Sequence, residues 1–155
     1  MALVKNTNSY LTVEEADSFF LDNKISEDWI DQDAILKAQA LVTATSILDD
    51  RSWIGVAVDA SQPLAFPRTG LYFDPKMGME VNMNVVPKRV LTALCLLADH
   101  IAKNDLFAAT DTVDSITVGP ISLNTIKTKS TQPPSFIMTI QPMLAHGRNA
   151  WWRAN

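Results

Sequence analysis

The spacing of apolar residues predicts a first helix in YLTVEEADSFFLDN, residues 10–23. Thr12 and Glu15 stand three residues apart in the order of a capping box, in which each side chain accepts a hydrogen bond from the other's backbone N–H. The apolar residues around them recur at helical spacing: Val13, Ala16, Phe19 and Phe20. We therefore expect a short amphipathic helix that begins next to Thr12.

A second, longer helix is predicted in DQDAILKAQALVTATSILDD, residues 31–50, and either Asp31 or Asp33 is expected to cap its start. Its expected buried stripe consists of Ala34, Ala38, Leu41, Ala44, Ile47 and Leu48. RSWIG follows this helix, and Gly55 is expected to reverse the direction of the chain.

Pro87 is expected in the first turn of a third helix, because a proline lacks the N–H that has no partner in that position. This helix runs to about Asn104 and is apolar on most sides, so we expect it to be the most enclosed element. The hydrophobic period then changes in SITVGPISLNTI, residues 115–126, where a Gly-Pro break predicts a small β-hairpin.

A last short helix is predicted over residues 134–147, with a kink at Pro142. The elements together predict a mainly α fold, in which residues 1–147 form a small helical bundle with a short β-hairpin. Residues 148–155 are expected to form an extended C-terminal tail. Residues 56–86 are expected to be a long connection within the bundle.

The composition is typical of one folded domain. The chain has 155 residues, of which 47% are hydrophobic and 19% are charged. No apolar stretch reaches the roughly 18 residues that a membrane span needs, and the N-terminus lacks the apolar core of a secretory signal. The single cysteine, Cys95, lies inside an apolar run, which indicates a reducing compartment and synthesis in the cytoplasm.

The formal net charge of −4 hides a gradient along the chain. Residues 1–34 contain eight acidic side chains against Lys5 and Lys24, whereas residues 115–155 contain no acidic side chain. Such an arrangement allows the acidic end of one copy to attract the basic end of a neighbouring copy. The alternative is that both ends are solvated faces without a partner.

The inventory of chemically reactive residues argues against an enzyme. Cys95 and His100 are five residues apart on one helix and so face different sides, which favours a core thiol over a nucleophile. EDWIDQD resembles a calcium loop only loosely, since it lacks the required glycine and the closing Glu. With five glycines, the chain contains no phosphate-cradling motif. We expect no catalytic residues, no metal and no cofactor.

Tryptophan and arginine remain as candidate binding residues. Trp29 and Trp53 flank the second predicted helix and are expected in the core or as a lid over it. The terminal RNAWWRAN is different, because adjacent tryptophans exposed at a terminus imply a protein pocket or a nucleic-acid strand as partner. The candidate docking residues are Arg148, Trp151, Trp152 and Arg153.

The segment QPLAFPRTGL, residues 62–71, packs prolines, an aromatic residue, an arginine and a glycine into ten positions. We interpret it as a structural clamp, with a subunit-contact loop and a catalytic loop as the alternatives. The residues of this clamp are Gln62, Pro63, Phe66, Pro67, Arg68 and Gly70. Arg68 is expected to bind carbonyls, or the carboxylates of Asp49 and Asp50, through its planar fork.

The order of SYLTVEEADSFF, AILKAQALVTATSILDD, RSWIG, QPLAFPRTG, VPKRVLTALCLLA and ITVGPI resembles the head–tail adaptor (connector) proteins of tailed bacteriophages. The same pattern is also described as a DnaT-like single-stranded-DNA-binding family. The resemblance covers about residues 9–126. Phe66 stands where such sequences have a tryptophan before Pro-Arg, and the residues after 147 match nothing in the pattern.

The adaptor resemblance implies a non-enzymatic virion protein in the neck between capsid and tail. It implies a ring, of twelve copies where it meets the portal, that extends the DNA channel without reading sequence and offers a docking surface to a tail or nozzle protein. The C-terminal tail is then expected to dock onto the portal or an adjacent subunit.

The alternative function is a single-stranded-DNA-binding module that uses the basic, tryptophan-bearing tail. The net acidity of the chain counts against this alternative, because affinity for DNA rests chiefly on neutralising phosphates. A regulatory or antitoxin-like partner protein is a third possibility.

Overall fold

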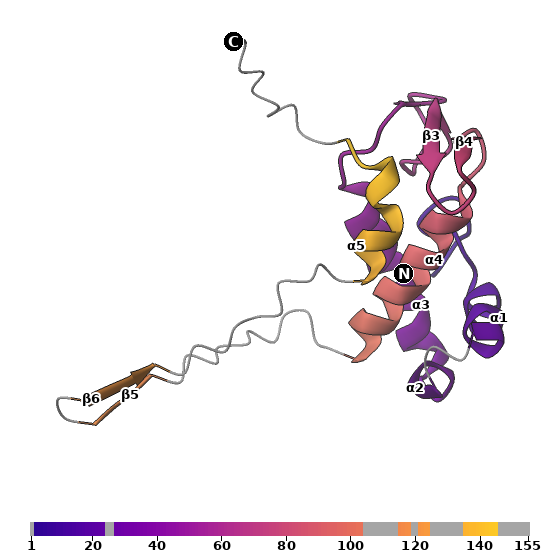
Figure 1. Ribbon diagram of the computed structural model, residues 1–155. Coiled ribbons are helices and arrows are strands. Elements are labelled where there is room, and N and C mark those ends of the chain that lie inside the picture. The colour runs from indigo at the N-terminus through magenta and orange to yellow at the C-terminus, as the bar shows by residue number, and fades with distance from the viewer. Residues whose placement is uncertain (1, 24–26, 104–114, 119–120, 125–134, 146–155) are drawn as a thin grey trace, which may run out of the picture.

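The helices of the chain form one bundle around α4. The computed structural model describes residues 2–23, 27–103, 115–118, 121–124 and 135–145. The helices in these residues are α1 (Val13–Asn23), α2 (Glu27–Ile30), α3 (Ala34–Asp49), α4 (Lys88–Lys103), α5 (Ser135–Ile140) and the short 3₁₀ helix η1 (Gln141–Met143). Figure 1 shows α4 beside both α3 and α5, its two main packing partners. The predicted mainly α fold is confirmed.

Local capping interactions define the starts of the predicted helices. The backbone N–H of Thr12 donates to Glu15 at 2.9 Å, and the N–H of Glu15 donates to the Thr12 hydroxyl at 3.2 Å, as a capping box requires. Asp33, one of the two predicted caps, accepts a hydrogen bond from the N–H of Ile35 at the start of α3. The N–H of Val90 donates to the Pro87 carbonyl, so α4 begins next to this proline as expected.

The expected long connection over residues 56–86 is wrong, because this segment forms four short strands. β1 (Val56–Ala57) pairs antiparallel with β2 (Arg68–Thr69), and β3 (Leu71–Asp74) pairs antiparallel with β4 (Met79–Asn82). Strands of two to four residues are too short to show a clear alternating pattern, and β1 and β2 are separated by ten residues of loop. Gly55 precedes β1 with φ +73°, consistent with the expected chain reversal.

The core lies between the helices and the β3–β4 hairpin. Its largest fully buried side chains include Trp29, Phe20, Leu41, Leu48 and Met83, and α4 adds Val90, Ala93, Leu94, Cys95, Leu97 and Ala98. The third predicted helix is therefore highly enclosed, as expected.

One side of α3 differs from the predicted buried stripe. Ala34 is exposed, whereas Lys37 is buried. The ammonium of Lys37 lies 3.1 Å from a carboxylate oxygen of Asp17 and 5.9 Å from the centre of the Trp29 ring. A partner on α1 and an aromatic residue on α2 thus compensate the burial of this charge.

The last helix is shorter than predicted. α5 ends at Ile140, and Pro142 lies in η1. The chain then becomes extended, and Leu144 forms a β-bridge with Trp53. The N–H of Ala145 donates to the carbonyl of Ser52 at 2.8 Å, which ties this end of the bundle to the segment before β1.

The predicted hairpin at residues 115–126 is present as β5 (Ser115–Val118) paired antiparallel with β6 (Ile121–Asn124). Figure 1 shows this strand pair lying away from the helical bundle. The predicted tail, residues 148–155, lies outside the described residues. No helix in the described ranges is long and apolar enough to span a bilayer.

Candidate functional site

The loop that connects β1 to β2 is anchored on the core by Phe66. This side chain is buried between the rings of Trp53, with centroids 4.9 Å apart, and Tyr10, with centroids 6.3 Å apart, both in edge-to-face geometry. The backbone N–H of Phe66 also donates to the Tyr10 hydroxyl. The Phe66–Pro67 peptide bond is cis.

Arg68 binds backbone carbonyls from two segments. Its Nε donates to Ile54 at 3.0 Å, its Nη1 to Ala65 at 3.2 Å and its Nη2 to Gly55 at 2.8 Å. The guanidinium therefore joins the loop to the chain reversal before β1, and the expectation of carbonyl acceptors agrees with these contacts.

The alternative acceptors expected for Arg68, Asp49 and Asp50, do not accept its hydrogen bonds. Asp49 instead accepts from the Tyr10 hydroxyl and from the N–H of Ala65. Burial raises the pKa of Asp49 above its usual range, although both hydrogen bonds act in the opposite direction. Asp49 thus holds the other side of the same loop.

The remaining loop residues make contacts within the loop itself. The side-chain amide of Gln62 donates to the carbonyls of Leu64 at 2.6 Å and Pro67 at 3.1 Å. Gly70 has φ +120°, a conformation that glycine adopts without strain. Gln62 and Pro67 are partly buried, whereas Pro63 is exposed.

We expect Arg68→Lys to destabilise the protein by about 1–3 kcal/mol, because an ammonium cannot reproduce three directed N–H donors. Urea denaturation of the variant measures this loss. Arg51→Lys, at an exposed position after α3, is the matched control and should leave the stability unchanged. Unchanged stability of Arg68→Lys together with lost self-association would assign Arg68 to a subunit contact instead.

Cys95, the thiol considered as a nucleophile, lies in the core. Burial raises the pKa of Cys95 to about 12, so the thiolate is disfavoured at neutral pH. The described residues contain no group of three or more His, Cys, Asp or Glu side chains placed to hold a metal ion.

The first two tryptophans are core residues rather than binding residues. Trp29 is fully buried against Phe20, and its indole N–H donates to Asp17 at 2.8 Å. Trp53 is 7% exposed, and its indole N–H donates to the carbonyl of Leu48 at 2.9 Å. Neither ring presents a free face to a ligand.

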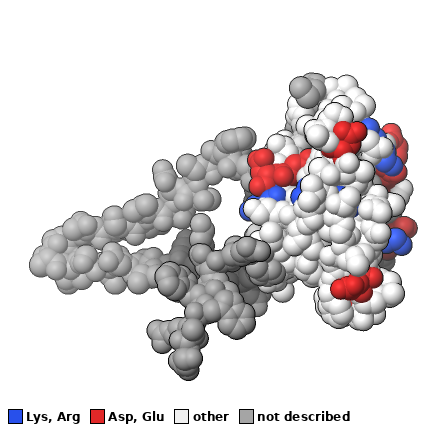
Figure 2. Space-filling model, turned by 90° about the horizontal axis from the view of Figure 1, so that it is seen from above, with Lys and Arg blue, Asp and Glu red and all other residues white. Residues whose placement is uncertain are grey.

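The described residues carry an excess of acidic groups, with fourteen Asp and Glu against eight Lys and Arg. Figure 2 looks down on the bundle and shows a largely uncharged surface with charged groups around its edge. By contrast, residues 125–155 contain Lys127, Lys129, Arg148 and Arg153 and no acidic residue. Four of the thirteen basic residues of the chain thus lie in a segment that has no acidic residue.

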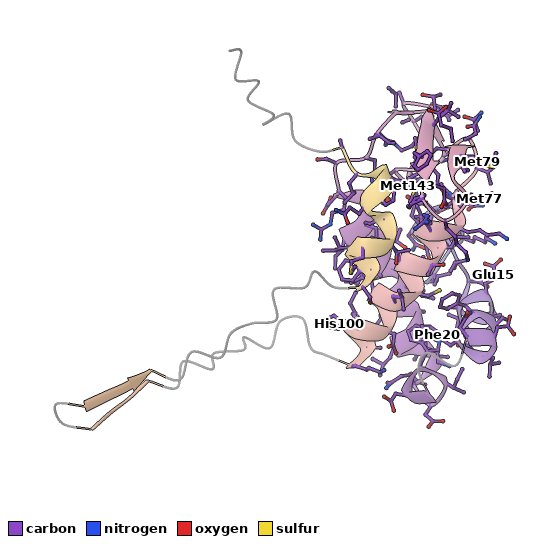
Figure 3. All side chains as sticks on the ribbon, in the orientation of Figure 1. Glu15, Phe20, Met77, Met79, His100 and Met143 are labelled. Carbon is purple, nitrogen blue, oxygen red and sulfur yellow. The ribbon has the colours of Figure 1, made fainter. Side chains whose placement is uncertain are left out.

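A cleft of about 530 Å³, which we call the β3–β4 cleft, lies between the β3–β4 hairpin, the beginning of α4 and α5. Its polar lining consists of Asp74, Lys76, Lys88, Arg89, Thr92 and Thr139. Its other lining residues are Tyr72, Met77, Val81 and Pro87. Figure 3 shows Met77 on the β3–β4 hairpin and Met143 on η1.

An ion pair forms the floor of this cleft. Arg89 donates to both carboxylate oxygens of Asp74, from Nε at 2.8 Å and from Nη2 at 2.7 Å, and its Nη1 donates to the carbonyl of Thr139. Asp74 also accepts from the N–H groups of Lys76 and Met77 in the turn after β3. The pair therefore links the hairpin to α4 and α5.

A family model described as "Putative DnaT-like ssDNA binding protein" matches residues 2–153. The chain belongs to this family. No curated protein and no solved structure matches it. The match agrees with the second of the two descriptions given to the sequence pattern, and none of these comparisons supports the head–tail adaptor resemblance.

The docking residues predicted for this DnaT-like protein, Arg148, Trp151, Trp152 and Arg153, lie outside the described residues. The residues of the β3–β4 cleft were not predicted at all. Most of them come from residues 72–92, but Thr139 lies far away in sequence, and neither stretch contains a recognisable motif. The one available signal is the pair of lysines, Lys76 and Lys88, in a stretch otherwise rich in apolar residues.

The Asp74–Arg89 pair in this DnaT-like protein predicts a pH-dependent stability. The hydrogen bonds from Arg89 hold the pKa of Asp74 well below its ordinary value of 3.8. Because the pKa is lowered in the folded state, the ionised carboxylate stabilises the fold above pH about 4, and this stabilisation is lost progressively as the pH falls further.

We expect Asp74→Asn to lower Tm by several degrees at neutral pH, because an amide cannot accept on both sides of the Arg89 fork. The difference from wild type should narrow as the pH falls below about 4, where the wild-type carboxylate loses its advantage. Thermal unfolding across this pH range measures both effects, and Asp31→Asn, at an exposed position, is the control. A difference in Tm that is independent of pH would contradict the ionic role of Asp74.

Proposed function

We propose that this DnaT-like protein binds single-stranded DNA and that residues 125–155 make the principal contact. The family description supports single-stranded DNA as the ligand. The distribution of tryptophans and charges along the chain supports residues 125–155 as the contact. The observation that carries the location is the burial of Trp29 and Trp53.

Base stacking requires an accessible aromatic face. Trp29 and Trp53 are committed to the core, and their indole N–H groups have protein acceptors. Trp151 and Trp152 lie outside the described residues, and Arg148 and Arg153 stand beside them in the sequence. Two stacking rings flanked by two guanidinium groups are a suitable combination for a single strand.

The charge of the bundle favours the same location. An excess of acidic groups in the described residues repels phosphates, so a strand gains affinity only where cations gather. Residues 125–155 carry four cations and no acid, and each cation that neutralises a phosphate releases bound counterions.

The experiment is a fluorescence anisotropy titration of a labelled oligothymidylate of about 20 nucleotides with the full chain. We expect binding at about 20 mM NaCl, with log K falling against log salt at a slope of about −3 or steeper, since four phosphate contacts on a single strand each contribute about −0.7 and any further contact adds to the slope. A duplex of the same length should bind more weakly, because its bases are not available for stacking. No binding at low salt, or equal affinity for the duplex, would overturn the proposal.

A second candidate function is that of a structural subunit, a head–tail adaptor whose copies form a ring in contact with portal and tail proteins. One observation favours it: seven large apolar side chains between residues 56 and 85 are exposed. They are Val56, Val58, Leu71, Phe73, Met77, Met79 and Val85. Where large exposed apolar side chains lie together on one face, they are more often a protein contact than a solvated face.

Leu71 and Phe73 are the two of these residues whose direction is defined by the burial pattern of their strand, β3. Tyr72 and Asp74 of the same strand are buried, so Leu71 and Phe73 point together to the opposite, solvent side of the hairpin. A neighbouring copy that covers this face would remove both side chains from water.

If the ring forms, the double variant Leu71→Ser/Phe73→Ser should reduce self-association of the purified protein by about tenfold or more, because it removes the apolar area of two side chains. Sedimentation velocity over a range of protein concentrations measures this change. Ile35→Ser, which alters an equally exposed apolar residue on α3, is the control and should associate as the wild type does. A wild-type protein that stays monomeric at every concentration rules out self-assembly into a ring.

A further inference from the structure

We propose that the β3–β4 cleft binds a phosphate group of single-stranded DNA, and that it is a second contact, separate from Arg148, Trp151, Trp152 and Arg153. The inference rests on the proposed function. It is drawn from the cations that line the cleft, from the absence of an ion pair at Lys76 and Lys88 within the described residues, and from the shape of the cleft.

The cleft has an excess of cations, whereas the rest of the bundle has an excess of acidic groups. The cleft lining contains three cations, Lys76, Lys88 and Arg89, and one carboxylate, Asp74. The other described residues hold thirteen acidic and five basic side chains. Three of the eight described cations thus converge on one hollow.

Of the three cations in the cleft, two have no ion-pair partner among the described residues. Arg89 and Asp74 neutralise each other through two short hydrogen bonds. Lys76 and Lys88 are exposed, and within the described part of the chain neither forms an ion pair. Two ammonium groups that have no ion-pair partner among the described residues and that line a concave site attract an anion, and a lysine binds a phosphate as a mobile point charge.

The shape of the cleft agrees with a nucleotide unit. Its volume of about 530 Å³ is within the usual range for small-ligand sites. Met77, Val81 and Pro87 provide an apolar wall for a sugar or a base, and the hydroxyl groups of Thr92 and Thr139 line the same hollow. The floor is rigid, because Arg89 is fixed to both β3 and α5.

The experiment compares charge reversals inside and outside the cleft, with the same labelled oligothymidylate as probe. Lys76→Glu and Lys88→Glu should each lower the affinity about threefold to tenfold and reduce the salt slope by about 0.7, whereas Arg51→Glu, at an exposed position away from the cleft, changes the net charge equally and should have a smaller effect. All three variants should keep the wild-type Tm, because none of the three side chains forms an ion pair in the described residues. Equal effects of the three reversals would overturn the cleft inference while leaving the proposed function intact.

A second measurement separates this inference from the proposed function. If the wild-type chain does not bind the oligonucleotide, the proposed function fails, and the cleft is then tested with inorganic pyrophosphate followed by the amide NMR signals of the protein. Shifts at Lys76, Lys88 and Thr92 that disappear in Lys76→Glu/Lys88→Glu would support a phosphate site independent of DNA. An absence of such shifts would overturn that site as well.

Discussion

Replacing Trp151 and Trp152 together by alanine is expected to weaken binding to oligothymidylate by about 30-fold or more. Stacking of a base on an aromatic side chain contributes about 1–3 kcal/mol, so the loss of two stacking rings accounts for at least about 2 kcal/mol. The Tm should remain that of the wild type, since the core already contains its own tryptophans, Trp29 and Trp53. Anisotropy titrations and thermal unfolding of the same preparations measure the two quantities.

The matched control for this double variant is Phe73→Ala. Phe73 is an aromatic residue of β3 that is 58% exposed, and it lies outside residues 125–155. Its replacement should leave DNA affinity unchanged if stacking is confined to the C-terminal segment. A Trp151→Ala/Trp152→Ala protein that melts much earlier than the wild type would instead assign these tryptophans to the core.

Gly55→Ala is expected to destabilise the fold by about 3 kcal/mol or more. Gly55 has φ +73°, which costs about 1–2 kcal/mol for a residue with a Cβ atom. The new Cβ would also lie 2.0 Å from the carbonyl oxygen of Thr69, a backbone atom of β2 that cannot move without breaking the β1–β2 pair. Urea denaturation measures the loss.

Gly78→Ala separates the two causes. Gly78 has a similar φ of +67°, but a Cβ there would meet no atom within 4 Å. It should therefore show the conformational cost of about 1–2 kcal/mol without the clash. If Gly55→Ala and Gly78→Ala lower the free energy of unfolding equally, the contact of the new Cβ atom with Thr69 does not destabilise the fold.

The features that the sequence predicts well are those decided by neighbouring residues. The start of α1 follows from Thr12 and Glu15, which satisfy each other's backbone N–H groups. The start of α4 follows from Pro87, whose missing N–H restricts it to a first turn. The β5–β6 hairpin follows from a change of period around a Gly-Pro break.

The features that escape the sequence depend on residues far apart in the chain. Lys37 reads as a solvent-facing residue of α3, yet Asp17 and the Trp29 ring compensate its burial. The strands between residues 56 and 82 are stabilised by pairing with each other and by the hydrogen bonds of Arg68 to Ile54 and Gly55. No local pattern encodes these partners.

The candidate site divides in the same way. A concentration of tryptophan and arginine at the C-terminus is visible in the sequence, because those residues are adjacent. The β3–β4 cleft is not visible, because Lys76, Arg89 and Thr139 come together only when the hairpin, α4 and α5 pack. Tertiary contacts alone decide whether a cation forms an ion pair with a carboxylate or lines a cleft.

The central claim is that residues 125–155 contact single-stranded DNA, and photo-crosslinking tests it most directly. The full chain is irradiated with a bromodeoxyuridine-substituted single strand, and the adducts are located by peptide mass spectrometry. The account predicts adducts on Trp151 or Trp152 and none on the buried Trp29 and Trp53. A chain that forms no DNA adduct within residues 125–155 would contradict it.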